Sequence, residues 1–269
     1  MSAFASHFAF EFRTGLRDRS LLLMNYLFPL VFYAVVSLLM TQLNPSFQPN
    51  VIPAMVVFVT LTSLVLGLPN PLVSAREAGI FRSFRVNGVP ALSALLIPAL
   101  TTAVHAVIVS MIVTLTAPVL FQAPAPVNWG GFAVFLALTV FSMAGLGVLI
   151  GVISANTRIT ILWSQVIFLP SLLIGGLMIP RSTLTGAMAQ ISGLWPSAHS
   201  MAIYDGLARG SGFDAQVALS LFVLLAVGIL AFALASYLFS WDSVNTTRRG
   251  SAWLALLVLV PFVAGMALS

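Results

Sequence analysis

Acidic, basic and histidine side chains are scarce in this chain, and their positions limit the chemistry it can perform. The 269 residues include 11 basic residues, six acids, three histidines and no cysteine. The missing cysteine excludes disulfides, thiolate metal sites and cysteine nucleophiles together. His105 is the only such side chain within a long apolar run. A hydrolase would need a nucleophile–base pair or a metal-ligand set there, so we predict no catalytic residue and no metal site.

The polar residues of the apolar stretches are better explained by packing. We interpret His105 as a hydrogen-bonding partner of a neighbouring helix, with a proton relay as the alternative. Asn25 is expected to bond across helices in the same way. His199 is interpreted as a surface residue of an outer loop, because no other ligands stand at metal-site spacing around it.

The densest charge in the chain lies at residues 74–90, which read SAREAGIFRSFRVNGVP. The preceding Pro69-Asn70-Pro71 is expected to bend or end a helix. Helical spacing places Ile80, Phe84 and the nearby Phe81 on one face, with two arginines beside them. An apolar knob flanked by charges fits a groove on another protein. The alternative is a charged hairpin that only holds the topology.

A second unusual stretch runs from residue 172 to residue 205. Gly175-Gly176 is expected to let a helix loosen or turn, and Pro180 to end it. The residues that follow are too apolar for a free loop. Short helices at a membrane interface are therefore predicted from the near-helical spacing of Leu184, Met188, Ile191, Leu194 and Trp195.

The elements that carry these segments are membrane helices. The chain is 60% hydrophobic and 6% charged, with a mean hydropathy of +1.08, whereas soluble domains are roughly 25% charged. A helix needs about 20 apolar residues to cross ~30 Å of hydrocarbon. We predict an all-α polytopic transmembrane bundle with six core spans and a C-terminal seventh at 251–268, whose alternative is a helix packed at the interface. The core spans are predicted at 20–41, 51–73, 91–120, 130–154, 159–179 and 216–240.

Arginine placement predicts which side of the bundle faces the cytoplasm. If the spans alternate, only Arg181 and Arg209 fall on one side, and nine arginines fall on the other. Those nine are Arg13, Arg17, Arg19, Arg76, Arg82, Arg85, Arg158, Arg248 and Arg249. By the positive-inside rule the N-terminus is cytoplasmic, in a multi-pass protein of the cell membrane. The arginines lie between apolar runs, so the net charge of +5 indicates membrane orientation and not nucleic-acid binding.

Two further patterns complete the predicted architecture. Residues 1–19 are predicted to form an amphipathic helix that suits the cytoplasmic headgroup layer, with a frayed tail as the alternative. They are followed by a transmembrane domain at 20–245 and by the extra apolar segment at 246–269. Gly147 and Gly151 permit close helix approach, either within the subunit or at a dimer seam. The apolar side of the first helix is predicted to hold Phe4, Ala5, Phe8, Ala9, Phe12 and Leu16.

The two unusual stretches carry a resemblance to a known family. The Arg-Glu-x-Gly motif after the second span resembles the cytoplasmic motif of the ABC-2 type permeases. The run Gly-Gly-x-x-x-Pro-x-x-x-Leu, followed by Trp-Pro and Tyr-Asp-Gly-Leu, is similar to that family's signature around its fifth span. The resemblance covers about residues 1–245. The apolar segment after Arg249 departs from it, because many members stop after six spans.

The resemblance implies the membrane half of an ATP-driven transporter. Two permeases would pair, as a homodimer or heterodimer, and each would dock on a separate ABC ATPase subunit that uses ATP and magnesium. The coupling contact would then involve Arg76, Glu77, Gly79, Phe81, Arg82, Phe84 and Arg85. The outer signature region would hold Gly175, Gly176, Pro180, Leu184, Pro196, Tyr204 and Asp205.

The remaining charge pattern agrees with a pump that takes its energy from a partner. The chain lacks G-x-x-x-x-G-K-[ST], so no ATP-binding loop of its own is expected, and it binds no cofactor itself. An exporter of an amphipathic drug, lipid or glycolipid fits the uncharged spans. Its substrate path would pass Met55, Phe58, Thr62, Phe168 and Ser171. The alternatives are an ion-coupled secondary transporter, which usually carries acids at membrane depth, and a membrane-anchored assembly subunit without an ATPase.

Overall fold

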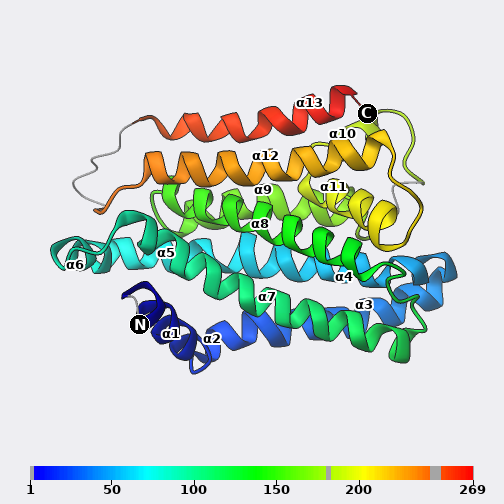
Figure 1. The fold of residues 1–269 in the computed structure, drawn as a ribbon, viewed down its shortest axis with the longest axis horizontal. Coiled ribbons are helices and arrows are strands. Elements are labelled where there is room, and N and C mark those ends of the chain that lie inside the picture. The colour runs from blue at the N-terminus through cyan, green and yellow to red at the C-terminus, as the bar shows by residue number, and fades with distance from the viewer. Residues whose placement is uncertain (1–2, 180–182, 243–249, 269) are drawn as a thin grey trace.

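The computed structural model describes residues 3–179, 183–242 and 250–268, and within these ranges the chain contains helices and no strand. The long helices run along a common axis and form an elongated bundle (Figure 1). Five of them are long and apolar enough to cross a membrane, and two more apolar helices are shorter. The predicted all-α polytopic fold is therefore confirmed.

The helices follow the predicted order along the chain. The five long ones are Leu23–Leu43, Phe47–Glu77, Ala91–Phe121, Trp129–Ile153 and Ala215–Leu238. Short π or 3₁₀ segments form part of the first two, and the second, Phe47–Glu77, carries the two labels α4 and α5 in Figure 1. The labelled α-helices are α1 (Ala3–Gly15), α2 (Arg19–Leu22), α3 (Phe28–Leu43), α4 (Val51–Thr60), α5 (Pro69–Glu77), α6 (Ile80–Val86), α7 (Ala91–Phe121), α8 (Trp129–Ile153), α9 (Thr157–Leu173), α10 (Ala187–Ser192), α11 (Pro196–Ile203), α12 (Ala215–Leu238) and α13 (Val260–Leu268).

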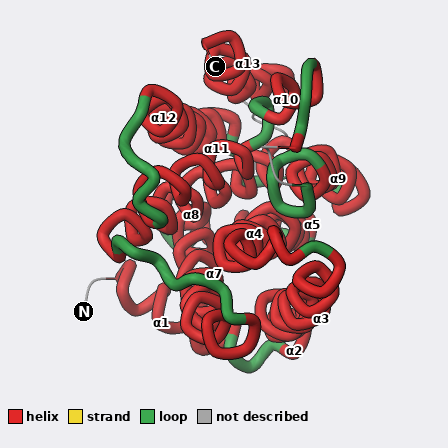
Figure 2. The backbone as a smooth tube through the Cα atoms, turned by 90° about the vertical axis from the view of Figure 1, so that its right-hand side faces the viewer, coloured by secondary structure: helices red, strands yellow, loops and turns green. Residues whose placement is uncertain are grey.

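The second span forms the centre of the bundle. Every residue of α4 is buried, and the end-on view places this helix in the middle, with the other long helices around it (Figure 2). A helix that is apolar on all sides is expected to be buried on all sides. The core of the molecule is therefore this span together with the facing sides of α7 and α8.

The glycines of α8 allow that close packing. A Cβ atom on Gly147 would overlap the Leu64 carbonyl oxygen, and one on Gly151 would lie 3.0 Å from the Leu72 side chain. Both neighbours belong to the second span of the same chain. The small-residue pair therefore packs the fourth span inside the subunit, and the dimer-seam alternative does not hold for these two glycines.

The two prolines after α4 were expected to bend or to end the second span, and they do not end it. A π-helical segment, Leu61–Gly67, joins α4 to α5, and the Leu68 amide donates to the Ser63 carbonyl at 3.0 Å. Pro69 then stands at the start of α5, where its missing N–H costs nothing. The resulting helix of 31 residues is about 46 Å long, so one end projects beyond a ~30 Å hydrocarbon layer.

The fifth span is shorter than predicted. Helix α9 ends at Leu173, before the glycine pair and well before Pro180, which lies outside the described residues. A Cβ atom on Gly175 would overlap the Ser197 hydroxyl of α11, and Gly176 has a φ of 95°. Close approach to α11 and a left-handed turn therefore stop the helix, not the proline.

The two ends of the chain also form helices. Helix α1 packs beside the first half of α7, where Phe12 stacks on His105 with ring centroids 4.8 Å apart. The C-terminal segment runs beside α12 (Figure 1) as a 3₁₀ helix, Ala252–Leu259, followed by α13. At about 2.0 Å per 3₁₀ residue and 1.5 Å per α residue its length is about 30 Å. This length suits a seventh crossing, which stays a prediction.

Candidate functional site

The charged segment after the second span forms a helix, a sharp turn and a second short helix. Helix α5 ends at Glu77, Gly79 takes the left-handed conformation with φ of 75°, and α6 begins at Ile80. The Ala78 amide donates to the Ser74 carbonyl and the Gly79 amide to the Arg76 carbonyl, as at many glycine-terminated helices. The glycine of the Arg-Glu-x-Gly motif is therefore required by the backbone conformation of the turn.

Arg76 is buried and holds the end of another helix. Its side chain is 5% exposed, and its Nη1 donates to the Val152 carbonyl at 2.9 Å. Its guanidinium also donates to the carbonyl oxygens of Gly151 and Ser154. These carbonyls belong to the C-terminal turn of α8, where a cation is favoured by unpaired acceptors and by the helix dipole. Arg76 thus ties the end of the second span to the end of the fourth.

Helix α6 packs its aromatic side against the bundle and exposes its charged side. Phe81 is buried, with its ring 5.5 Å from that of Phe239. Phe84 is half-buried, with its ring 5.4 Å from that of His7 in α1. Ile80 remains 45% exposed. The expected apolar knob therefore differs from the prediction, because the two phenylalanines face inward and Ile80 faces outward.

The outward surface of α6 is mixed in character. Arg82 pairs with Asp242, which follows α12, at 2.6 Å. Glu77 and Arg85 are exposed, and Val86 is 83% exposed. We call this surface the α6 face, defined by Glu77, Ile80, Arg82, Arg85 and Val86. It exposes apolar side chains and charges of both signs within one short segment.

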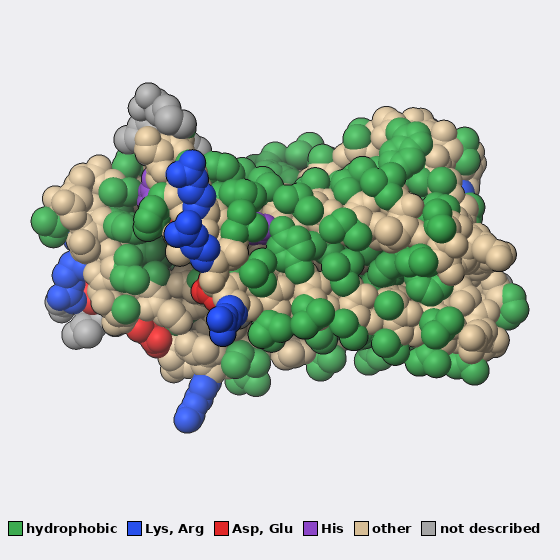
Figure 3. Space-filling model, turned by 90° about the horizontal axis from the view of Figure 1, so that it is seen from below, with side chains coloured by type: hydrophobic (Ala, Val, Ile, Leu, Met, Phe, Trp, Pro, Cys, Tyr) green, Lys and Arg blue, Asp and Glu red, His purple; other side chains and the backbone are tan. Residues whose placement is uncertain are grey.

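The basic side chains of the described residues gather at the end of the bundle that holds α6. Figure 3 shows them at the left end of this face, while the rest of the face is largely hydrophobic. Arg209 lies at the opposite end, where its Nη2 donates to the Pro49 carbonyl at 2.6 Å. Arg181, Arg248 and Arg249 lie outside the described residues. That this end faces the cytoplasm stays a prediction.

The predicted outer signature region forms a buried helix at the opposite end from α6. Pro196 begins α11, and the π segment Tyr204–Ala208 continues it. Tyr204 is buried with its ring 5.2 Å from that of Phe135, and burial raises its pKa to about 12. Asp205 pairs with Arg209 at 3.1 Å. Burial raises the pKa of Asp205, and Arg209 offsets part of that rise. Leu184 precedes this region and is half-buried.

The five residues predicted to line a substrate path are all buried in the single subunit. Met55, Phe58 and Ser171 are inaccessible, and Phe168 is 7% exposed. The rings of Phe58 and Phe168 lie 6.0 Å apart, so the second and fifth spans are in contact here. Of the five, Thr62 lines a cavity of the described structure.

That cavity lies between α1, the start of the first span, the middle of the second span, and α7. Its volume is about 520 Å³. We call it the inner cavity. His105 stands in its wall, and the Tyr26 hydroxyl lies 2.6 Å from His105 Nδ1. The interpretation of His105 as an interhelical hydrogen-bonding residue is confirmed. The cavity itself was not predicted, because its lining comes from four separate parts of the sequence.

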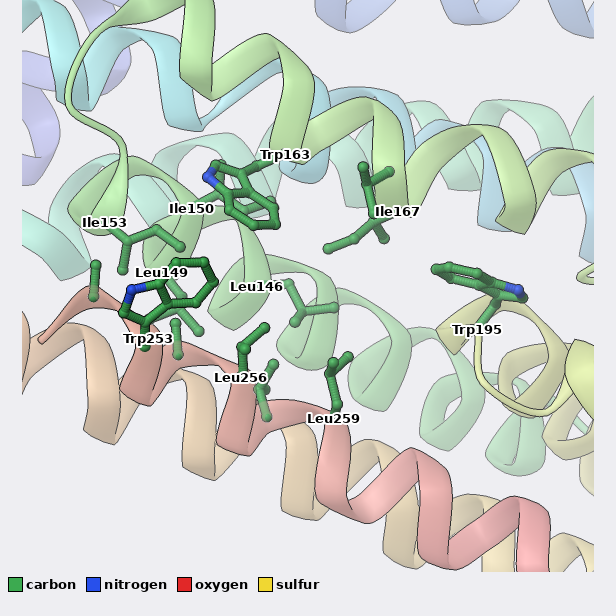
Figure 4. Close-up of a pocket in the computed structure, with 14 residues that line it drawn as sticks. Leu146, Leu149, Ile150, Ile153, Trp163, Ile167, Trp195, Trp253, Leu256 and Leu259 are labelled. Carbon is green, nitrogen blue, oxygen red and sulfur yellow. The ribbon is translucent and has the colours of Figure 1, made fainter.

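A second cavity is almost wholly apolar. It has a volume of about 400 Å³ and lies between α8, α9 and the 3₁₀ segment near the C-terminus. In Figure 4, Trp163 and Trp253 lie near one end and Trp195 at the other, with Leu146 and Leu256 between them. We call it the tryptophan crevice. It offers hydrocarbon packing and almost no hydrogen bonding.

One polar residue lies elsewhere than predicted. His199 is 1% exposed, so its interpretation as a surface residue is wrong. Its Nδ1 lies 3.2 Å from the Ser220 hydroxyl, and its Nε2 lies 2.9 Å from the Gly193 carbonyl. These partners come from the start of α12 and the end of α10, and the helical fold of residues 187–203 brings them together. Across the described ranges, no three His, Cys, Asp or Glu side chains are placed to hold a metal ion.

The comparison with protein families agrees with this geometry. A family model described as ABC-2 type transporter matches residues 3–207 of the chain. This range begins with α1, includes the Gly79 turn and the buried α11, and ends within the π segment after α11. No curated protein and no solved structure matches the chain.

Proposed function

Because this chain belongs to the ABC-2 type transporter family, we propose that it is the permease subunit of an ATP-binding cassette exporter. It would move an amphipathic drug, lipid or glycolipid out of the cell. The energy would come from ATP and magnesium bound by a separate ATPase subunit. A second permease, identical or related, would complete the transport unit, and the arginine-rich end would face the cytoplasm.

The observation that carries this proposal is the exposed α6 face at the end of the second span. The α6 face projects from the end of a helix of 31 residues, and exposes charged and apolar side chains together. A surface of this kind, beyond the hydrocarbon layer, is where an ATPase subunit can bind. The alternative is that this segment only holds the topology of the chain. That role would not require Ile80 and Val86 to be exposed.

Arg76 supplies the link from that surface to the transmembrane helices. In this proposal, displacement of α6 moves α5 through the Gly79 turn, and α5 moves the end of α8 through the Arg76 guanidinium. Helices α5 and α8 are in contact beyond this one residue. Rigid-body motion of packed helices is a common way for transporters to change access. In this proposal Arg76 is a positioning residue and does not touch the ATPase.

Contact between the second and fifth spans suits a closed state. The rings of Phe58 and Phe168 fill the space where the substrate would pass. Separation of these two spans after ATP binding would expose small polar side chains such as Thr62 and Ser171, together with aromatic surface. A path of this composition favours amphipathic molecules over free ions.

The experiment uses the chain co-expressed with its ATPase subunit and reconstituted in vesicles. Ile80→Asp on the α6 face is expected to abolish most ATP-driven transport and to leave the fold intact, since the side chain is exposed. Val127→Asp, at an exposed position between α7 and α8 on the opposite end, is the matched control and is expected to transport normally. ATP-driven transport by Ile80→Asp at the parent rate would contradict the docking assignment. Transport driven by a sodium or proton gradient without any ATPase would overturn the proposed class.

A further inference from the structure

The inner cavity has a charge and hydrogen-bonding character that no step of the transport cycle proposed above uses. Two carboxylates, those of Glu11 and Asp18, stand in its lining, and no arginine does. This is unexpected in a chain with nearly twice as many basic as acidic residues. We propose that the inner cavity binds an amphipathic cation, a protonated amine attached to an apolar chain.

The polar wall of the cavity is short of hydrogen-bond partners. The side-chain oxygens of Asn25, Asn70 and Thr101 are buried and have no partner within the described residues. Asn25 is 2% exposed and Thr101 is 6% exposed. Buried polar groups are nearly always paired in native proteins, so a cluster without partners points to a missing donor. An ammonium group has three donors and no acceptor, which matches oxygens of this kind.

The acids and the unpaired oxygens line the same cavity. Glu11 lies on α1 and Asp18 just after it, whereas Asn25 and Thr101 lie deeper along the first and third spans. The Leu21 amide donates to Asp18 Oδ1 at 3.3 Å, which holds that carboxylate near the start of the first span. A cation at this place gains two charge attractions and several hydrogen bonds together.

The remaining lining suits an apolar chain. Met24 and Phe28 line the cavity and are also 58% and 44% exposed on the outside of the bundle. In a membrane that outside surface meets lipid. The tail of a bound amphiphile can therefore extend between these side chains toward the bilayer, while its head group stays among the polar residues.

The rival occupant is the anionic head group of a phospholipid. Its phosphate would meet two carboxylates and, in the lining of the cavity, no guanidinium. Anion sites in proteins are instead built from arginine, lysine or backbone amides. The charge of the lining therefore favours the cation over the phosphate, although both carry apolar chains.

The cavity is also in contact with the proposed coupling segment. Helix α1 forms one wall, and its His7 ring lies 5.4 Å from Phe84 of α6. Phe12 of the same helix stacks on His105 inside the cavity wall. Movement of α6 would therefore shift one wall of the site. The role of the bound cation as cargo rests on the proposed function. Binding of the cation to the cavity does not depend on that function.

Binding is tested on the full-length chain in nanodiscs of zwitterionic lipid, with empty nanodiscs as the blank. The probe is radiolabelled dodecylammonium, and dodecyl sulfate is the probe of opposite charge. The double variant Glu11→Gln, Asp18→Asn is expected to weaken dodecylammonium binding at least about tenfold, and Thr101→Val about threefold. Asp214→Asn removes a charge far from the cavity and keeps the cap of α12. This control is expected to bind as the parent does.

Parent-like binding by both the double variant and Thr101→Val would overturn the proposal, as would tighter binding of dodecyl sulfate than of dodecylammonium. The thermal unfolding midpoint of each variant shows whether it is folded. Thr101→Val removes one hydroxyl at nearly constant volume, so it keeps the test valid if the double variant does not fold. Binding that persists in a chain without ATP-driven transport would leave the cation site standing while the proposed function fails.

Discussion

Arg76 and Arg85 stand on either side of the Gly79 turn, the first buried at the end of α5 and the second exposed on α6. Arg76 donates to the carbonyls that end α8, whereas the Arg85 side chain is exposed. The same residue type in one short segment thus does two different things. Arg76 holds transmembrane helices together, and the α6 face is available to another protein. Density of charge alone does not separate these roles.

The largest effect is expected from loss of the buried arginine. Arg76→Gln removes charged hydrogen bonds to the end of α8 and leaves carbonyl oxygens unpaired, so unfolding free energy should fall by roughly 3 kcal/mol. Arg85→Gln should leave it unchanged, because the side chain is exposed. Thermal unfolding midpoints in nanodiscs measure both. Equal midpoints for the two variants would remove the distinction between the two arginines.

The next largest effect is expected on the affinity for the ATPase subunit, without a change in stability. Ile80→Asp places a charge on an exposed apolar side chain of the α6 face, and the few residues that dominate an interface each contribute about 2 kcal/mol or more. Affinity for the ATPase subunit should fall at least about tenfold, with the unfolding midpoint unchanged. Titration of the purified ATPase against the chain in nanodiscs gives the affinity, with Val127→Asp as control. Unchanged affinity would show that the α6 face is not the contact.

A smaller effect is expected at the turn between the two regions. Gly79→Ala forces a side chain into the left-handed conformation at a cost of about 1 kcal/mol. No atom lies within 4 Å of the added Cβ, so backbone strain is the whole cost. Gly79→Asn should lose less, because asparagine tolerates this conformation. Identical midpoints for alanine, asparagine and the parent would contradict the role given to this glycine.

The smallest effect is expected for the ion pair that fastens α6 to the chain after α12. Arg82 and Asp242 lie 2.6 Å apart, but the Arg82 side chain is 61% exposed. Such pairs contribute about 0.2–1 kcal/mol and weaken with salt. A double-mutant cycle with Arg82→Gln and Asp242→Asn measures the coupling energy. A value above about 2 kcal/mol would make this pair a structural link comparable with Arg76.

Much of the fold was predictable from the sequence because membrane helices leave a simple signal. The long apolar runs matched the long helices, and the interruptions at Pro45 and at residues 122–128 fell between spans. The end of the fifth span was mispredicted. Pro180 is visible in the sequence as a helix breaker, whereas the contact of Gly175 with Ser197 depends on where α11 packs.

The site was predictable in position and not in orientation. The Arg-Glu-x-Gly segment lies at the end of the second long helix, close to its expected place, but the direction of each side chain depends on the bundle beside it. Phe81 and Phe84 face inward because Phe239 and His7 are near. The inner cavity had a partial signal in Asn25 and His105, which are polar residues in apolar runs. Its acids come from residues 1–19, and only the packing of α1 against α7 brings these together with the spans.

In the function proposed here, the α6 face binds an ABC ATPase subunit. Its most direct test is a photo-crosslinking amino acid at position 80 of the full-length chain in native membranes, with the same amino acid at position 127 as the control. We expect a crosslink from position 80 to a protein whose peptides include an ATP-binding G-x-x-x-x-G-K-[ST] loop, and none from position 127. No ATPase crosslink from position 80, or an equal one from position 127, would contradict it.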